Sequence, residues 1–374
     1  MTALTAIVPD VLVAGGGPAG AALATHLARR GRAVVLMEQS AAAHHKVCGE
    51  FLSHEAVTAL DRLGIDLHRL GALPILGVRL SAQKEIAACD LSFPACSLTR
   101  RSLDESLLAV AAQAGATVLR GHRIDSLSPS GRTWTAQLSE GETYCAPAAF
   151  LAAGKHDVNG HRRPPGVQND LVAFKMYYRL SPAQRCALHG WVELFLFPGG
   201  YAGLQLSGDH MANLCLLVNR RTLRARGNDW GSLMEHLCDS SPALAARLDG
   251  AEPLLSKPLA LSSIPYGMQL ARSKPGLWRL GDQAAVIPSF SGDGMAIALH
   301  SAQRAAGCFL AGKSSETYAT TLARELHASI GFATTVARLL IAAPALAQAA
   351  RLWPPLLKLV ADRTRIFPYA LAAQ

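Results

Sequence analysis

The 374-residue sequence has little charge, few aromatic residues and no long uninterrupted apolar run. Charged residues make up 17% of the chain and aromatic residues 6%, while half of all residues are hydrophobic. This balance excludes a disordered chain. The most apolar stretch, residues 339–350, lies between Arg338 and Arg351 and contains Pro344. It is too short to span a bilayer.

Paired cysteines are also absent. The eight cysteines show neither CxxC spacing nor the pattern of a disulfide framework. The first residues, MTALTAIVPD, lack the basic start and apolar run of a signal peptide. Together these absences predict a cytoplasmic protein with reduced cysteines. Because no histidine or cysteine spacing is typical of a metal site, we predict no metal.

The chain has an excess of positive charge, with a formal net charge of +9. Its arginines are scattered and form no Lys/Arg block interleaved with aromatic residues, so nucleic-acid binding is not expected. An anionic cofactor, an acidic carrier protein or an anionic membrane surface would attract the same charge. The expected partner is a small hydrophobic substrate, free or carrier-bound, and peripheral membrane contact stays open.

What the sequence does contain is a dinucleotide-binding pattern near its start. The apolar run VLVA (11–14) leads into GGGPAG (15–20), a helical stretch and a second apolar strand that ends in an acidic residue. The first glycine permits a tight turn, the second lets the backbone approach a pyrophosphate, and the third lets the helix pack closely on the strand. The acidic residue can accept hydrogen bonds from ribose. This pattern predicts cofactor contacts at Gly15, Gly17, Pro18, Ala19, Gly20 and Glu38.

A second glycine-rich signal lies far along the chain, in LWRLGDQAAVIPSFSGDGMAIAL (277–299). A short strand ends at Gly281 and Asp282, and a Gly-Asp-Gly turn opens another helix at Met295. The aspartate can bind the hydroxyl groups of a cofactor's linker, and N–H groups at the helix start can face a developing negative charge. Two separated sites, one for a pyrophosphate and one for a polyol and an electron-accepting ring, favour FAD over NAD.

In these motifs the sequence resembles FAD-dependent oxidoreductases of the p-hydroxybenzoate hydroxylase fold, and most closely the geranylgeranyl reductase family. The resemblance rests on GGGPAG, MEQ (37–39), CGEFL (48–52), TRRSLD (99–104), the FP of LFLFP (194–198), GDQAAVIP and SGDGMAIAL. It offers Cys48, Glu50 and Pro288 as candidate catalytic residues. It also implies cofactor contacts at Gln39, Cys48, Gly49, Glu50, Leu52, Arg100, Ile124, Gly281, Asp282, Pro288, Gly292, Gly294 and Met295.

The expected fold class is α/β (α+β), with a Rossmann-like FAD-binding domain, an inserted antiparallel β-sheet substrate domain and a C-terminal helical region. The FAD-binding domain is discontinuous and comprises residues 1–75, 98–165 and 276–315. Runs such as FKMYYRL (174–180), separated by Gly, Pro, Asn and Asp, predict the substrate domain over 76–97 and 166–275. Residues 316–374 are predicted to form a helical cap over the substrate, or alternatively a helical segment on a membrane surface.

Two segments depart from the patterns of these relatives. Where flavin hydroxylases carry Ala-Asp-Gly, this chain reads Ala-Ala-Gly followed by Lys155 and His156. These two residues either meet the phosphates of a nicotinamide donor or are ordinary loop residues, so the electron donor is NAD(P)H or a separate reductase. The reductase pattern Y-x-W-x-F-P is reduced to its Phe-Pro here, with Glu193 and Phe195 in place of Tyr and Trp.

The aromatic residues Phe195, Phe197 and Tyr201 either line a substrate cavity or belong to the sheet core. The favoured function is an FAD-dependent monooxygenase that acts on a hydrophobic or aromatic metabolite. The first alternative is a C=C reductase of a prenyl-type substrate, similar to geranylgeranyl reductases. The second alternative is a sensor that binds FAD without turnover.

Overall fold

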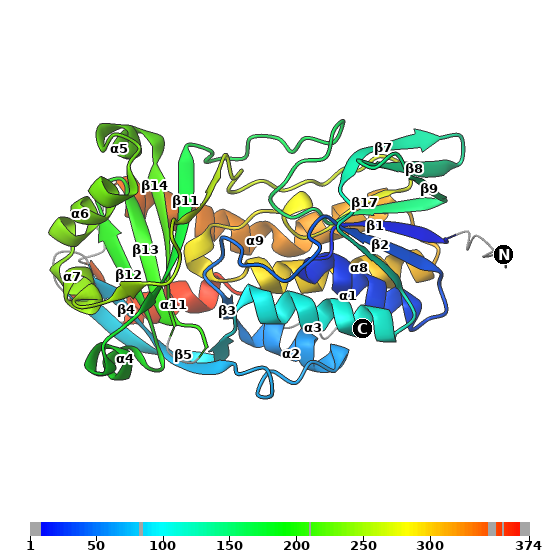
Figure 1. The fold of residues 1–374 in the computed structure, drawn as a ribbon. Coiled ribbons are helices and arrows are strands. Elements are labelled where there is room, and N and C mark those ends of the chain that lie inside the picture. The colour runs from blue at the N-terminus through cyan, green and yellow to red at the C-terminus, as the bar shows by residue number, and fades with distance from the viewer. Residues whose placement is uncertain (1–8, 82–84, 209–210, 343–348, 354, 367–374) are drawn as a thin grey trace.

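The computed structural model describes residues 9–81, 85–208, 211–342, 349–353 and 355–366. A parallel sheet lies at one end of the elongated molecule and a large, mostly antiparallel sheet at the other, with long helices between them (Figure 1). The expected mixed α/β architecture with a parallel sheet, a separate antiparallel sheet and C-terminal helices is confirmed.

The parallel sheet is short-stranded and buried on both faces. Its apolar strands put Val11 and Val13 in a core with helices, and Leu12 and Ala14 in a core on the opposite face, as expected for a parallel sheet covered on both sides. Its spatial order is β17 (Leu277–Arg279), β10 (Ala148–Leu151), β1 (Val11–Ala14), β2 (Val34–Glu38) and β6 (Thr117–Arg120).

One face of this sheet is covered by helices and the other by a small second sheet. The helices are α1 (Pro18–Ala28), α3 (Arg100–Gln113) and α8 (Gly294–Leu310), with α2 (His54–Leu63) beside α8. The small sheet consists of β7 (Ile124–Ser130), β8 (Thr133–Leu138) and β9 (Thr143–Ala146). Strand β6 ends at Arg120, and the left-handed backbone of Gly121 (φ +80°) turns the chain before β7.

The second large sheet is antiparallel except where β12 pairs with β4. Its order is β15 (Glu252–Pro253), β11 (Leu171–Arg179), β14 (Ala212–Asn219), β13 (Gly200–Leu206), β12 (Trp191–Phe197), β4 (Leu73–Ser81), β5 (Glu85–Ser97) and β3 (Phe51–Leu52), with β16 (Leu259–Ser262) also paired to β11. Strand β3 follows the CGE motif directly, so the motif leads from the parallel sheet into this one.

Four helices within the middle region were not expected from its β-rich sequence. Each begins at a side chain that accepts a hydrogen bond from the backbone N–H three residues on, the geometry of an N-cap. The caps are Ser181, Asn219, Asp229 and Ser241, and the helices are α4 (Pro182–Leu188), α5 (Arg220–Ala225), α6 (Trp230–Ser240) and α7 (Pro242–Leu248).

The C-terminal region forms α9 (Ser315–Ala342), α10 (Ala349–Leu352) and α11 (Pro355–Arg363). Tyr318, Leu322 and Leu326 of α9 lie in the core that includes α8 and α1, whereas α10 and α11 contact β5. Prolines at 344 and 354–355 predict breaks in this helical region. Pro344 and Pro354 lie outside the described residues, and Pro355 is the first residue of α11. Among the residues that are described, no helix is both long and apolar enough to cross a membrane.

Candidate cofactor and substrate site

A cavity of about 920 Å³ is enclosed by three parts of the chain. The first is the carboxyl edge of the parallel sheet, where Gly15 and Gly281 follow strands β1 and β17 and Glu38 ends strand β2. The second is the inner face of the antiparallel sheet, and the third is the C-terminal helices. Ligands of open α/β sheets bind at the carboxyl ends of the strands, so this edge is the expected cofactor position.

The glycine-rich turn after β1 has the shape of a phosphate-binding turn. Gly15 has a left-handed φ of +107°, and a Cβ there would lie 2.5 Å from the carbonyl oxygen of Ala152. A Cβ on Gly20 would lie 1.9 Å from the Gly15 oxygen, so Gly20 serves helix packing and is not part of the cavity wall. Helix α1 starts at Gly17 without a side-chain cap, which leaves its first N–H groups available for a pyrophosphate.

Glu38, the last residue of β2, stabilises the fold in addition to its expected role in binding ribose. Glu38 lines the cavity but is only 6% exposed. One of its carboxylate oxygens accepts a hydrogen bond from the Gly16 N–H at 2.8 Å, and the other accepts one from the Ser40 N–H at 2.9 Å. A carboxylate can accept further bonds from ribose hydroxyls. The same side chain therefore fixes the glycine turn.

The second glycine-rich segment lies on the opposite side of the cofactor edge. The Gly281 N–H donates to the Ser301 hydroxyl at 2.9 Å, and Asp282 lines the cavity. Gly294 and Met295 begin α8, which also has no side-chain cap. Gly292 has a φ of +75°, and a Cβ there would lie 2.5 Å from the ring of Phe51. An uncapped second helix thus faces the same cavity as α1.

Most of the cofactor contacts expected from the sequence line this one cavity, and three do not. Leu52 is fully buried in the core, since it pairs with Cys96 in the sheet, and Gly20 and Pro288 are likewise absent from the wall. The residues that the fold brings to the cavity are Gly15, Gly17, Pro18, Ala19, Glu38, Gln39, Cys48, Gly49, Glu50, Arg100, Ile124, Gly281, Asp282, Gly292, Gly294 and Met295.

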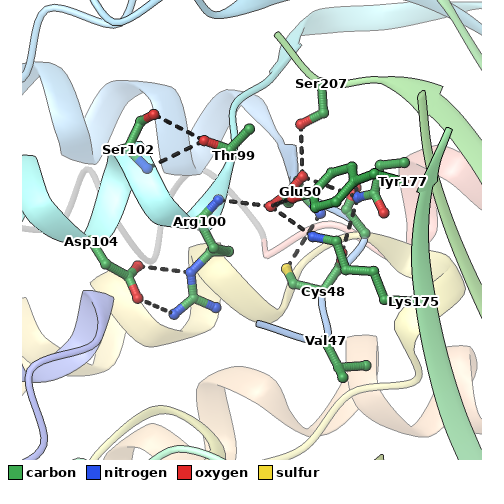
Figure 2. A network of polar contacts seen from close by, with 12 residues as sticks. Val47, Cys48, Glu50, Thr99, Arg100, Ser102, Asp104, Lys175, Tyr177 and Ser207 are labelled. Carbon is green, nitrogen blue, oxygen red and sulfur yellow. Dashed lines mark hydrogen bonds and ion pairs between the residues drawn. The ribbon is translucent and has the colours of Figure 1, made fainter. Parts of the chain in front are cut away.

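Glu50 of the CGE motif is the centre of a buried polar network (Figure 2). Its side chain is fully buried, and its backbone has a left-handed φ of +63°. The carboxylate pairs with the Lys175 ammonium at 2.7 Å and accepts hydrogen bonds from the Tyr177 and Ser207 hydroxyls, both at 2.7 Å. It also accepts the Arg100 N–H at 2.8 Å. One carboxylate therefore joins the motif to β11, the end of β13 and the start of α3.

The same network fixes the backbone of the loop before Glu50. The Asn213 amide on β14 donates to the carbonyl oxygens of Cys48 and Gly49, both at 3.0 Å. The Cys48 sulfur accepts the Glu50 N–H at 3.3 Å. Because Cys48 and Gly49 line the cavity, these bonds determine the shape of the wall that faces the cofactor.

Lys175 and Tyr177 are partners of the CGE motif that the sequence reading missed. Both lie in the run FKMYYRL, which was assigned only to a sheet. The side chain of Lys175 is 0% exposed, and burial, followed by the Glu50 carboxylate, raises the pKa of Tyr177. A lysine in an apolar strand, two residues from a tyrosine on the same face, is the signal that could have predicted a buried acidic partner.

Arg100 holds the start of α3 by a forked ion pair. Its guanidinium donates to both oxygens of Asp104 at 2.8 Å, and Lys46 donates to the same carboxylate at 2.9 Å. Burial opposes the charge of Arg100, but the Asp104 carboxylate outweighs it and raises the pKa of Arg100. Arg100 therefore presents a fixed positive charge at the cavity wall.

On the substrate side, the structure divides the three aromatic residues between the two alternatives, the cavity wall and the sheet core. Phe195 and Phe197 lie in the core that includes Leu188, Leu233 and Leu244 of helices α4, α6 and α7, and Tyr201 lines the cavity. Side chains alternate along a strand, and on β12 it is Val192 and Leu194 that face the cavity.

Glu193, which stands in place of the tyrosine of the reductase pattern, follows the same alternation of side chains along β12. Glu193 lies on the helix side of β12 and forms ion pairs with Arg79 at 2.9 Å and Arg247 at 2.8 Å. It joins β4 to α7 and does not line the cavity. Where the reductase pattern has a tyrosine, this chain therefore has a structural ion pair.

The loop after β10 is part of the site. Lys155 lines the cavity and donates to the Val47 carbonyl at 3.1 Å. Arg163 donates to the Lys155 carbonyl at 2.7 Å, and Gln283 donates to the carbonyls of Gly154 at 2.7 Å and His156 at 2.8 Å. These bonds join the loop to the segment after β17. A contact between Lys155 or His156 and an electron donor stays a prediction.

All eight cysteines are free. Within the described ranges, no group of three or more His, Cys, Asp and Glu side chains is arranged to hold a metal ion. The cavity wall instead contains the uncapped N-termini of α1 and α8 and the side chain of Asp282. In front of Gly49 and Gly294 the space is open, so a ligand can approach the backbone closely. This set of donors and close-approach positions fits the pyrophosphate, polyol and ring of FAD.

The contrast between Asp282 and Glu38 gives a first prediction. Asp282→Ala is expected to weaken FAD binding by about 1.5–3 kcal/mol, the range for a hydrogen bond to a charged group, without changing the stability of the apoprotein. Glu38→Ala should weaken FAD binding and also lower the melting temperature of the apoprotein, because it leaves the Gly16 and Ser40 N–H groups unpaired. FAD titration and thermal unfolding of both apoproteins test this. If the Glu38→Ala apoprotein melts at the same temperature as the Asp282→Ala apoprotein, Glu38 does not stabilise the glycine turn.

Comparison with known proteins supports this interpretation of the site. Residues 9–153 match the family model of the FAD binding domain. A menaquinone reductase of Mycolicibacterium smegmatis is 35% identical over 158 residues, which are 40% of this chain and 39% of that protein. The match thus covers less than half of the reductase's length. A digeranylgeranylglycerophospholipid reductase of Thermoplasma volcanium is 25% identical over 79% of this chain and 76% of its own.

The fold also resembles a solved structure over nearly its whole length. PqsL of Pseudomonas aeruginosa, a probable FAD-dependent monooxygenase, superposes with a TM-score of 0.73 at 19% identity, covering 92% of this chain and 99% of its own. The family match gives the cofactor and the superposition gives the fold. Residues 9–153 are therefore similar to an FAD binding domain, and the chain as a whole has the fold of this probable monooxygenase.

Proposed function

We propose that the protein is a monooxygenase that transfers one oxygen atom from O₂ to a hydrophobic or aromatic metabolite. The observation that carries this proposal is the largely apolar cavity, which joins the FAD edge to the inner face of the antiparallel sheet. Bound FAD, once reduced, would deliver electrons to O₂ and so activate one of its oxygen atoms for transfer. We expect those electrons to come from NAD(P)H or a separate reductase.

The walls away from the FAD edge are apolar and come from distant segments. Strands β4 and β5 contribute Leu80 and Phe93, and α9 and α11 contribute Leu340, Leu357 and others. Such walls attract an apolar substrate through the area removed from water, roughly 25 cal/mol per Å². They also exclude water from the reacting oxygen, and in this way suppress release of hydrogen peroxide.

Two tyrosines supply polar atoms in this otherwise apolar region. The Tyr201 oxygen accepts the Phe290 N–H at 3.1 Å, and the Tyr266 hydroxyl lies 2.7 Å from the Ser289 hydroxyl. Burial raises the pKa of both tyrosines, so both stay protonated. They hold the segment before α8, and the Tyr201 proton is directed to a polar group of the substrate in this proposal.

A C=C reductase is the second candidate, because Cys48 of the CGE motif lines the cavity. Its thiol could donate a proton to carbon while hydride comes from reduced FAD. The partial match to a menaquinone reductase and the longer match to a phospholipid reductase also support this alternative. The two functions differ in their requirement for O₂.

Reoxidation of the reduced enzyme distinguishes them. Photoreduced protein is mixed with long-chain alkylphenols or prenyl alcohols, with and without O₂, while flavin absorbance is followed. A monooxygenase should stay reduced without O₂ and should form an oxygenated product when O₂ is admitted. Anaerobic reoxidation by one of the unsaturated probes, with the product two hydrogens heavier, would favour the reductase.

A further inference from the structure

The C-terminal end of the described chain contacts the FAD turn through one arginine. Arg365, two residues after α11, is 8% exposed. Its guanidinium pairs with the Asp293 carboxylate at 2.7 Å and donates to the Ser291 carbonyl. It also lies 5.7 Å from the ring centre of Phe51 and 5.1 Å from that of Phe93, both within cation–π range.

These contacts reach the wall of the cofactor site. Asp293 is fully buried in the Gly-Asp-Gly turn and immediately precedes α8. Phe51 follows Glu50 directly, and its ring is the group that a Cβ on Gly292 would strike. Arg365 therefore contacts both segments that bound the expected flavin position, the turn before α8 and the strand after the CGE motif.

The ion pair between Arg365 and Asp293 is buried, and breaking such a pair lowers the stability of a protein. Burial raises the pKa of Asp293 to about 7, and the Arg365 guanidinium opposes that rise. Removing one partner of a buried pair leaves the other charge without compensation. Ser329 of α9 also donates to the Arg365 carbonyl at 3.1 Å, so α9, the end of α11 and the FAD turn meet at this residue.

We propose that Arg365 is a positioning residue that couples the C-terminal helices to the FAD site. It holds the Ser291–Gly294 turn in the shape that receives the cofactor, while Leu357 and Val360 of the preceding helix close the cavity. Coupling of this kind is reciprocal. Bound FAD must then stabilise α11 over the cavity. The inference rests on FAD binding and is independent of the reaction catalysed.

The test measures FAD affinity and FAD-dependent protection of α11 in the full-length protein. Arg365→Met should raise the Kd for FAD at least tenfold. The control is Arg363→Met, which should leave the Kd unchanged because Arg363, the last residue of α11, is exposed. Endoproteinase Lys-C cleaves after Lys358, which is exposed on α11. Saturating FAD should slow this cleavage in wild type and in Arg363→Met, but not in Arg365→Met.

A reference lysine separates coupling from general stabilisation. Lys257 lies in the loop before β16 and is exposed, so its cleavage rate reports on the substrate sheet. If FAD slows cleavage of the wild-type protein equally at Lys257 and Lys358, the proposal is overturned. It is also overturned if FAD does not change the rate of cleavage at Lys358. Both outcomes are read from wild type alone, so the proposal stays testable even if Arg365→Met fails to fold.

Discussion

Glu50→Gln is expected to lower the free energy of unfolding by about 3–5 kcal/mol, because it leaves the buried Lys175 ammonium without a counter-charge. Lys175 is 0% exposed and its ammonium lies 2.7 Å from the carboxylate. The same substitution should release the cavity loop at Cys48 and Gly49 and weaken FAD binding. Chemical denaturation of the apoprotein and FAD titration measure the two effects separately.

A double substitution gives the matched test of this account. Lys175→Met in the Glu50→Gln protein removes the uncompensated charge, and most of the lost stability should return. The exposed pair of Arg179 and Glu252, with side chains 60% and 68% exposed, is the control, since such a pair contributes only about 0–1 kcal/mol. If Glu50→Gln destabilises no more than Glu252→Gln, the network does not hold the motif in place.

Removal of residues 343–374 is expected to abolish productive turnover. The shortened chain ends after α9, whose first half stays packed in the FAD-domain core. It exposes the cavity walls formed by Leu80 and Phe93. Open apolar walls either aggregate or admit water. The shortened protein should therefore precipitate, or its reduced flavin should convert O₂ to hydrogen peroxide without product.

Hydrogen peroxide and product yields, measured against the full-length enzyme, check this prediction. Soluble shortened protein with unchanged product yield would show that these helices do not close the cavity. Binding of the intact protein to anionic vesicles that weakens with salt would support the alternative role at a membrane surface.

The cofactor edge could be predicted from the sequence because its chemistry depends on local motifs. Gly15 and Glu38 lie within one β-turn-α-β unit, and the spacing of residue types predicts their proximity. Gly281 and Asp282 follow another strand of the same parallel sheet, so the fold class brings them to the same edge. Backbone turns and strand ends are determined by a few neighbouring residues, which a single sequence contains.

The substrate side could not be predicted in this way. Which face of β12 meets the cavity depends on strand pairing and on helices α4–α7, so the sequence left the position of Phe195 open and did not indicate Val192. The side chains that bind Glu50 lie 125 or more residues away along the chain and become its neighbours only in the folded sheet. Arg365 is likewise brought to Asp293 by the packing of α11, which no local pattern determines.

Oxygen-18 gas tests the central claim most directly. Full-length protein reconstituted with FAD is supplied with reducing equivalents, an alkylphenol that speeds reoxidation, and labelled O₂, and the product is analysed by mass spectrometry. The proposal predicts one labelled oxygen atom per product molecule and none from solvent water. A product without label, or one that forms equally well without O₂, would contradict it.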